Sequence, residues 1–151
     1  MVRVPRITER SQVADEHGEI FDSITSSRGR VSGPFSVLLN SPETAGRAAH
    51  LGAYLRFNST IPDDQRELAI ITAAREFDCD YEWSAHKGLA QQAGVRDEAI
   101  EIVANKGTVD SLTSDEATII SYGRELFQDH RVSDSTFDAA KEMLGEQGVT
   151  E

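Results

Sequence analysis

The stretch CDYEWSAH, residues 79–86, combines side chains that could perform chemistry. It holds the only cysteine of the chain, Cys79, and its only tryptophan, Trp83, together with Glu82 and His86. In a helix, spacings of three and four residues place Cys79, Glu82 and His86 on one side, because each residue advances by about 100°. That side is also the apolar one, so we expect it to face the core. A thiol, a carboxylate and an imidazole so arranged suit acid–base catalysis, thiol chemistry or metal binding.

A second carboxylate, Glu67, lies on the apolar side of the preceding predicted helix. If the two helices form an antiparallel hairpin across the junction of residues 77–78, Glu67 approaches the far end of the CDYEWSAH stretch. Two carboxylates and an imidazole in an apolar pocket perturb one another's proton affinities, as general acid–base catalysis requires. We therefore predict Glu67, Glu82 and His86 as a catalytic set.

The same residues also have structural interpretations. Glu67 could belong to a capping box with Asp64 at the N-cap, and Glu82 with His86 could form a local ion pair on the helix surface. Glu67, Glu82 and His86 could form a carboxylate-rich metal site. No fourth ligand is evident, so we predict no metal.

Cys79 and Trp83 are the remaining candidates in the stretch. A lone cysteine is most commonly a small buried hydrophobe, although Cys79 is also a possible redox or pocket residue. Trp83 is expected in the core or an interface, with a pocket wall as the alternative.

Nearly every segment of the chain has helical periodicity, and none alternates with a period of two. Two helix starts carry capping serines, Ser114 and Ser133, and a third has Ser41 followed by Pro42 at the first helical position. Gly94 is a predicted C-terminal cap. The first two expected helices cover roughly residues 9–26 and 43–58, and the third follows Pro62 and carries Leu68, Ile71 and Ala74. The fourth contains the CDYEWSAH stretch and ends at Gly94, and a short helix covers residues 97–105. The last two begin at the capping serines and carry Ala117, Ile120 and Phe127, and Phe137, Ala140 and Leu144. The sequence predicts an all-α protein with a single domain.

The composition is that of a globular protein, with 38% hydrophobic and 27% charged residues. A formal net charge of −11 disfavours nucleic acid and anionic membrane surfaces as partners, because both are rich in phosphate. No stretch approaches the roughly 18 apolar residues of a membrane span. One cysteine excludes a disulfide within the chain and suits a reducing compartment. The expected location is cytoplasmic.

The segment RELAIITAAREFDCDYEWSAHKGLAQQAGV resembles the signature region of the carboxymuconolactone decarboxylase family, which includes the AhpD-type alkylhydroperoxidases. The resemblance extends to GPF and LGAYLRFNSTIPDDQRELAI before it and to DEATIISYGRELFQDHRVSDSTFDAAKEMLG after it. It implies an AhpD-like helical bundle. It also implies a division into residues 1–32, an N-terminal helix and loop, and residues 33–151, the family domain, from which the family's C-terminal helix is missing.

The chain departs from the pattern of the family's redox branch at one position, and this difference bears on its chemistry. The redox branch of the family has a glutamate, a CxxC pair twelve residues later, and a histidine four residues after the second cysteine. Glu67, Cys79 and His86 match this pattern, whereas Glu82 replaces the second cysteine. Without that cysteine a dithiol–disulfide cycle cannot run within the chain, so the resemblance favours the decarboxylase side.

The decarboxylase side implies a small carboxylated lactone or a similar metabolite as substrate, no cofactor and a homo-oligomer, either trimer or hexamer. His86 or Glu82 would protonate the carbon that loses CO2, and Glu67 would orient the histidine. Arg66 and Arg75 are the candidates for binding a carboxylate. The alternatives are a single-cysteine hydroperoxide reductase acting through Cys79 and a non-catalytic protein that binds a small molecule.

Overall fold

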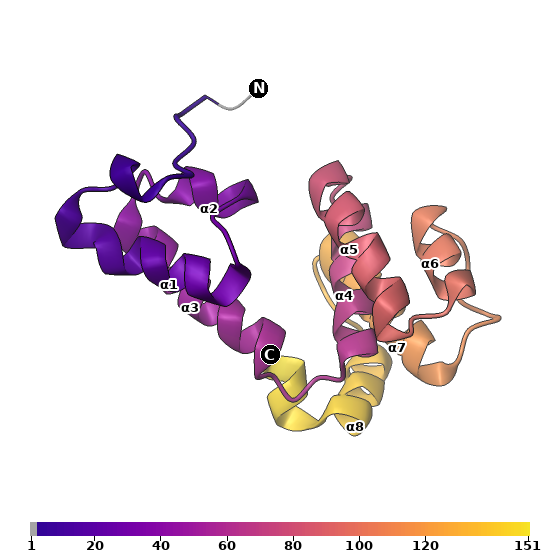
Figure 1. The fold of residues 1–151 in the computed structure, drawn as a ribbon. Coiled ribbons are helices and arrows are strands. Elements are labelled where there is room, and N and C mark those ends of the chain that lie inside the picture. Colours follow the sequence, from indigo (N-terminus) through magenta and orange to yellow (C-terminus); the bar gives the residue numbers. More distant parts are fainter. Residues whose placement is uncertain (1–2) are drawn as a thin grey trace. The chain divides into compact units, whose positions relative to one another are not determined.

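A computed structural model describes residues 3–151 and shows a chain built from helices (Figure 1). Within that range there is no β-strand, so the prediction of an all-α, AhpD-like bundle is confirmed. The helices form two compact units that meet in sequence between Ser59 and Thr60. The expected division after residue 32 stays a prediction, because a compact unit is not the same as a family domain.

The first unit contains three helices and two short 3-10 turns. Its elements are η1 (Arg10–Gln12), η2 (Asp15–His17), α1 (Gly18–Arg28), α2 (Gly33–Leu38) and α3 (Pro42–Phe57). Their core consists of Val13, Phe21, Ile24, Val31, Leu39, Ala45 and Ala49. The predicted helix over residues 9–26 is wrong in its first half, because α1 begins at Gly18 and the two 3-10 turns precede it.

The second unit is built around α4 (Asp63–Glu76). It continues with α5 (Asp80–Ala93), α6 (Asp97–Ala104), α7 (Ser114–Arg124), the π-helix η3 (Glu125–Asp129) and α8 (Asp134–Thr150), which is kinked at Gly145. Leu68 and Ile71 of α4 pack into a core with apolar residues of α5, α6 and α7. Burial of this common core fixes α4 among its neighbours, because apolar burial contributes roughly 25 cal/mol per Å².

One small residue lets α7 come close to α4. A Cβ atom at Gly123 of α7 would lie 2.8 Å from Cγ2 of Thr72, a separation that real side chains do not show. Thr72 is buried, and its hydroxyl donates a hydrogen bond to the carbonyl of Leu68 (2.8 Å). The glycine therefore sets the spacing between the two helices.

The ends of the helices largely follow the sequence signals. Gly94 adopts the left-handed conformation at the end of α5 (φ 99°), and the Ser133 hydroxyl accepts a hydrogen bond from the N–H of Thr136 at the start of α8. The prediction of Ser114 as a cap is wrong: Thr113 is the N-cap of α7, because its side chain and that of Glu116 form a capping box.

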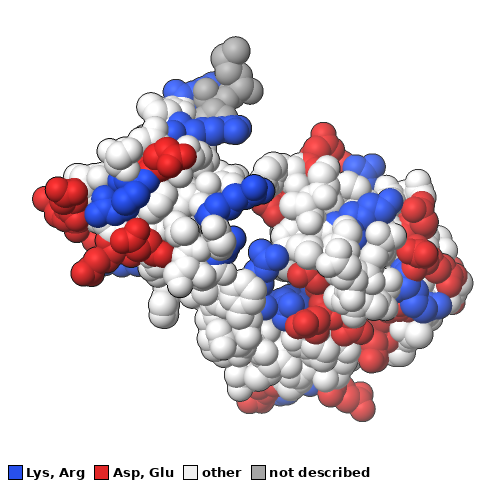
Figure 2. All heavy atoms as spheres, in the orientation of Figure 1, with Lys and Arg blue, Asp and Glu red and all other residues white. Residues whose placement is uncertain are grey.

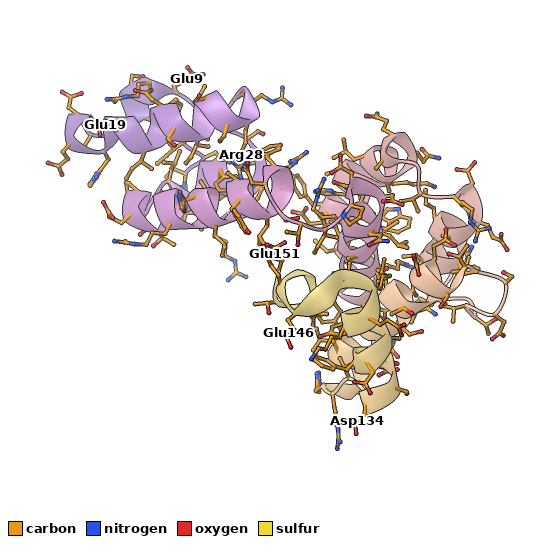
Figure 3. The ribbon with its side chains drawn as sticks, turned by 90° about the horizontal axis from the view of Figure 1, so that it is seen from below. Glu9, Glu19, Arg28, Asp134, Glu146 and Glu151 are labelled. Carbon is orange, nitrogen blue, oxygen red and sulfur yellow. The ribbon has the colours of Figure 1, made fainter. Side chains whose placement is uncertain are left out.

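The C-terminal end of the second unit is bonded to its beginning. Glu151, labelled in Figure 3, accepts hydrogen bonds at Oε2 from the N–H and the hydroxyl of Thr60, at 2.7 and 3.0 Å. Both residues lie within the second unit, so this contact fixes the segment that leads into α4.

Candidate functional site

The hairpin of α4 and α5 depends on a tight turn at residues 77–79. Asp78 has a positive φ of 48°. This angle reverses the chain, and aspartate tolerates it better than most residues do. The N–H of Cys79 donates to the carbonyl of Ala74 (2.8 Å), and Nη1 of Arg75 lies 3.2 Å from Oδ1 of Asp78. These contacts return α5 along α4, as the predicted hairpin requires.

The hairpin brings Glu67 of α4 and His86 of α5 together. Oε2 of Glu67 lies 2.7 Å from Nδ1 of His86, and only 6% of the glutamate side chain and 13% of the histidine side chain are exposed. An ionised carboxylate can only accept a hydrogen bond, so with Glu67 ionised this contact places a hydrogen on Nδ1. Glu67 therefore fixes both the orientation of the ring and the nitrogen that is left for chemistry.

Glu82 lies on the other side of the imidazole. Its Oε2 is 3.5 Å from Nε2 of His86, and 40% of its side chain is exposed. This separation is longer than an ordinary hydrogen bond. The imidazole thus stands between an inner, buried carboxylate and an outer carboxylate that solvent reaches. The structure brings Glu67, Glu82 and His86 together as the sequence predicted.

The structural interpretation of Glu67 as a capping residue is wrong. The N-cap of α4 is Pro62, so Asp64 lies inside the first turn and cannot form a capping box with Glu67. The side chain of Glu67 instead faces His86, and burial of the carboxylate is compensated by that hydrogen bond.

Cys79 differs from its predicted position. Helix α5 begins at Asp80, and Cys79 is its N-cap with non-helical backbone angles (φ −86°, ψ 86°). The helical wheel that grouped Cys79 with Glu82 and His86 therefore does not apply to it. Its carbonyl accepts the hydrogen bond of the Trp83 N–H (3.0 Å), and the thiol is free and partly buried.

Trp83 belongs to the edge of the core. Its partly buried ring packs against the apolar cluster of the second unit, and Nζ of Lys87 lies 5.9 Å from the ring centroid. This placement agrees with the expectation of a core residue.

Arg66 and Arg75, the two arginines of α4, have different surroundings. Arg75 donates from Nε to the carbonyl of Ala104 (2.8 Å) and pairs with Asp78, so it fixes the hairpin turn to α6. Arg66 pairs through Nη1 with the exposed Asp63 (2.8 Å), while its Nε is buried and has no hydrogen-bond partner among the described residues.

The negative charge is concentrated in the second unit. The unit that ends at Ser59 contains seven of the 15 Lys and Arg residues and six of the 26 Asp and Glu residues. The unit of Thr60–Glu151 therefore contains eight basic and 20 acidic residues. Acidic side chains recur over the face of this unit that Figure 2 draws.

From residue 3 to residue 151, no cluster of three or more His, Cys, Asp or Glu side chains is arranged to hold a metal ion. Over the same range, no helix combines the length and the apolar character that crossing a membrane requires.

One comparison with known proteins identifies a family. The model of the carboxymuconolactone decarboxylase family matches residues 42–122, which is more than half of the chain and includes Glu67, Cys79, Glu82 and His86. A search of individually curated proteins gave no match. Since the family model covers most of α3 through α7 and all the predicted site residues, the chain belongs to the carboxymuconolactone decarboxylase family.

Proposed function

We propose that the protein is an acid–base enzyme that decarboxylates a small carboxylated lactone or a related carbonyl compound, with His86 as the proton carrier. The observation that supports this most strongly is the 2.7 Å contact between Nδ1 of His86 and buried Glu67. Imidazole is the side chain that takes up and releases a proton near neutral pH, so a ring held in one orientation suits proton transfer to carbon.

The contacts of the ring suggest a role for each group. Nδ1 is occupied by Glu67, which leaves Nε2 as the nitrogen that meets the substrate. Glu67 touches only the histidine in this scheme, so it is a positioning residue. Glu82 lies beside Nε2 and is partly exposed, so it can exchange protons with solvent and resupply the ring.

The reaction breaks the bond between the substrate carbon and its carboxylate. CO2 leaves, and the electron pair stays on the carbon, where conjugation with the neighbouring carbonyl makes an enolate. The proton on Nε2 of His86 then moves to that carbon and completes the product. No oxidant or reductant takes part, which is consistent with a chain that lacks a second cysteine.

The direct test compares His86→Gln with the unchanged protein on a panel of carboxylated lactones and β-keto acids, by following CO2 release. We expect turnover to fall at least about 100-fold, since a positioned acid–base group contributes about 10²- to 10⁴-fold. Circular dichroism should show unchanged helix content.

Cys79→Ser is the matched control, because it tests the hydroperoxide reductase alternative on the same hairpin. We expect CO2 release to be unchanged in this variant. The proposal would be wrong if His86→Gln kept its decarboxylase activity, and the reductase would be supported if peroxide consumption vanished in Cys79→Ser. Binding of the panel without turnover in the unchanged protein would favour the non-catalytic alternative.

We further propose a cytoplasmic homo-oligomer, either a trimer or a hexamer. Exposed apolar side chains at Leu51, Phe57, Phe77 and Tyr81 support association, because such surface is favourable to bury. Sedimentation equilibrium tests the subunit number.

A further inference from the structure

Two groups of exposed apolar side chains lie on different units of the chain. On α3, Leu51, Tyr54 and Phe57 recur every three residues along one side of the helix and are 59%, 40% and 55% exposed. At the turn between α4 and α5, Phe77 and Tyr81 are 67% and 56% exposed. Large apolar side chains that gather on a surface in this way mark interaction sites. The first group is named the α3 face and the second the turn face.

Two guanidiniums without counter-ions accompany the α3 face. Cζ of Arg56 lies 5.5 Å from the centroid of the Phe57 ring. Arg28, labelled in Figure 3, ends α1, and its Nη2 lies only 3.2 Å from the position of a Cβ atom at Gly52. Gly52 and Arg56 are one turn apart on α3, so the two arginines are neighbours. Burial and the charge of Arg56 lower the pKa of Arg28.

Uncompensated positive charge is a property of the first unit. Two of its seven basic side chains, those of Arg10 and Arg47, have a carboxylate within 4.0 Å. In the part of the chain that is described, the remaining five have none: Arg3, Arg6, Arg28, Arg30 and Arg56. Between residues 60 and 151 the ratio is reversed, because every basic side chain except that of Arg131 has a carboxylate partner.

The turn face carries the opposite charge. Asp80 stands between Phe77 and Tyr81 in the sequence, is exposed, and has no basic side chain within 4.0 Å among residues 3–151. The second unit as a whole has 20 acidic and eight basic residues. The turn face is therefore apolar and acidic, whereas the α3 face is apolar and basic. Surfaces with this relation are complementary, because opposite potentials steer them together and apolar burial holds them.

The proposed oligomer requires two different surfaces on each subunit. In a ring of three identical subunits, every subunit touches one neighbour through one surface and the other neighbour through another. A contact of one surface with itself joins copies only in pairs. A trimer, or a hexamer assembled from trimers, therefore needs two complementary surfaces, and the α3 face and the turn face fit this requirement in apolar character and in sign of charge.

We propose that the α3 face of one copy docks on the turn face of a second copy, so that the subunits join head to tail. This inference rests on the proposed homo-oligomer and names its interface. The exposed aromatic and aliphatic side chains of both faces provide the affinity, because such residues dominate binding at the centre of an interface. Arg28 and Arg56 meet the acidic unit of the second copy and increase the rate of association.

A mixture of two variants distinguishes this arrangement from a contact of one surface with itself. Leu51→Ser with Phe57→Ser disrupts the α3 face, and Phe77→Ser with Tyr81→Ser disrupts the turn face. Sedimentation velocity should show each variant as a monomer where the unchanged protein is an oligomer, because losing central apolar residues weakens binding by about 30-fold or more. An equimolar mixture should form a 1:1 dimer and nothing larger, since one intact face of each kind remains.

The charges are tested separately. Arg28→Gln with Arg56→Gln should weaken association about 10-fold at about 50 mM NaCl and much less at about 500 mM, where salt screens exposed charges. Lys141→Gln is the control, because it removes a positive charge on α8 that is paired with Glu146. It should leave association unchanged at both salt concentrations.

The proposal is overturned if the mixture stays monomeric, if either apolar variant still forms the oligomer, or if the arginine variant associates normally at low salt. If Phe77→Ser with Tyr81→Ser does not fold by circular dichroism, Asp80→Arg with Tyr81→Ser replaces it, with the same expected dimer in the mixture. An unchanged protein that is monomeric at every concentration overturns the proposed oligomer as well. Turnover that persists in His86→Gln contradicts the proposed reaction alone.

Discussion

Glu67 and Glu76 are two glutamates of α4, nine residues apart, whose side chains are both buried but have different kinds of partner. The Glu67 side chain is 6% exposed and faces an imidazole at 2.7 Å. The Glu76 side chain is 2% exposed and faces Arg124 at 3.6 Å and Lys106 at 3.9 Å, with the amide of Gln128 as a hydrogen-bond donor. Burial alone therefore does not distinguish the proposed site residue Glu67 from Glu76, whose partners are permanent charges and an amide.

The partners account for the difference. Arginine and lysine stay charged over the whole physiological range, so Glu76 has a permanent counter-charge. Histidine takes up and releases a proton near neutral pH, so the charge facing Glu67 can change during a reaction. Glu76, at one end of α4, therefore holds α7 and η3 through its ion pair and hydrogen bond, whereas Glu67, near the other end, faces the histidine that we propose as the proton carrier.

The largest expected effect comes from removing the anchor. Glu76→Ala leaves two cations without their shared carboxylate, and breaking a buried pair in this way costs about 3–5 kcal/mol. We expect a large drop in urea midpoint but, in the fraction that remains folded, decarboxylation within about twofold of the unchanged protein. Loss of activity without loss of stability would contradict the assignment of Glu76 as structural.

At Glu67, near the other end of α4, we expect a large loss of activity with only a small loss of stability. Glu67→Gln keeps an acceptor for Nδ1–H of His86 but removes the charge that faces the ring. Turnover should fall about 10- to 100-fold, while the free energy of unfolding changes by roughly 1 kcal/mol, the usual value for one hydrogen bond. Steady-state kinetics and urea unfolding on the same preparation make the comparison. A variant that is unstable but fully active would show that Glu67 serves only packing.

The sequence predicted that Glu67 and His86 come together, but it did not predict the partners of Glu76. Glu67 and His86 lie on adjoining helices joined by three residues, so helical spacing and a short turn were sufficient to bring them together. The partners of Glu76 follow it by as many as 52 residues, and no local pattern links them. They meet only because of how α7 and η3 pack on α4.

Two local errors have identifiable causes. The sequence extended α5 to Cys79 because helical spacing was informative, but the positive φ of Asp78 makes the helix begin one residue later. The start of α7 was assigned to Ser114, although Thr113 stands three residues before Glu116, which is the spacing of a capping box. The capping-box spacing of Thr113 and Glu116 can therefore be read from the sequence alone.

A smaller effect tests how closely α7 packs against the part of α4 that lies between Glu67 and Glu76. Gly123→Ala places a methyl group against Thr72, which lies between Glu67 and Glu76 on α4. Overpacking of this kind costs about 1–3 kcal/mol.

Gly88→Ala on α5 is the control, because a Cβ atom there meets nothing within 4 Å. It should stabilise the protein by up to about 1 kcal/mol through helix propensity. Thermal unfolding of the two variants should therefore shift in opposite directions; a shift of both in the same direction would contradict the close approach of α7.

The smallest effect concerns Glu116. Like Glu76 it pairs with an arginine, but this pair is more exposed to solvent. Nε of Arg96 donates to its Oε1 at 2.9 Å, and this hydrogen bond, with those from Thr113, lowers the pKa of Glu116 to about 2 against the cost of burial. Because its pKa in the folded state is below the value of about 4.3 in the unfolded chain, the stabilisation is present above that value and is lost as the pH falls toward about 2. Arg96 is solvated, which screens the pair and keeps its contribution below those of the buried groups.

Glu116→Gln should therefore destabilise the protein slightly at neutral pH, and the difference from the unchanged chain should shrink as the pH falls through the window between the two pKa values. Urea unfolding across this range measures it, with Glu142→Gln as an exposed control. A difference that stayed constant with pH would show that the glutamate acts through helix capping and not through its charge.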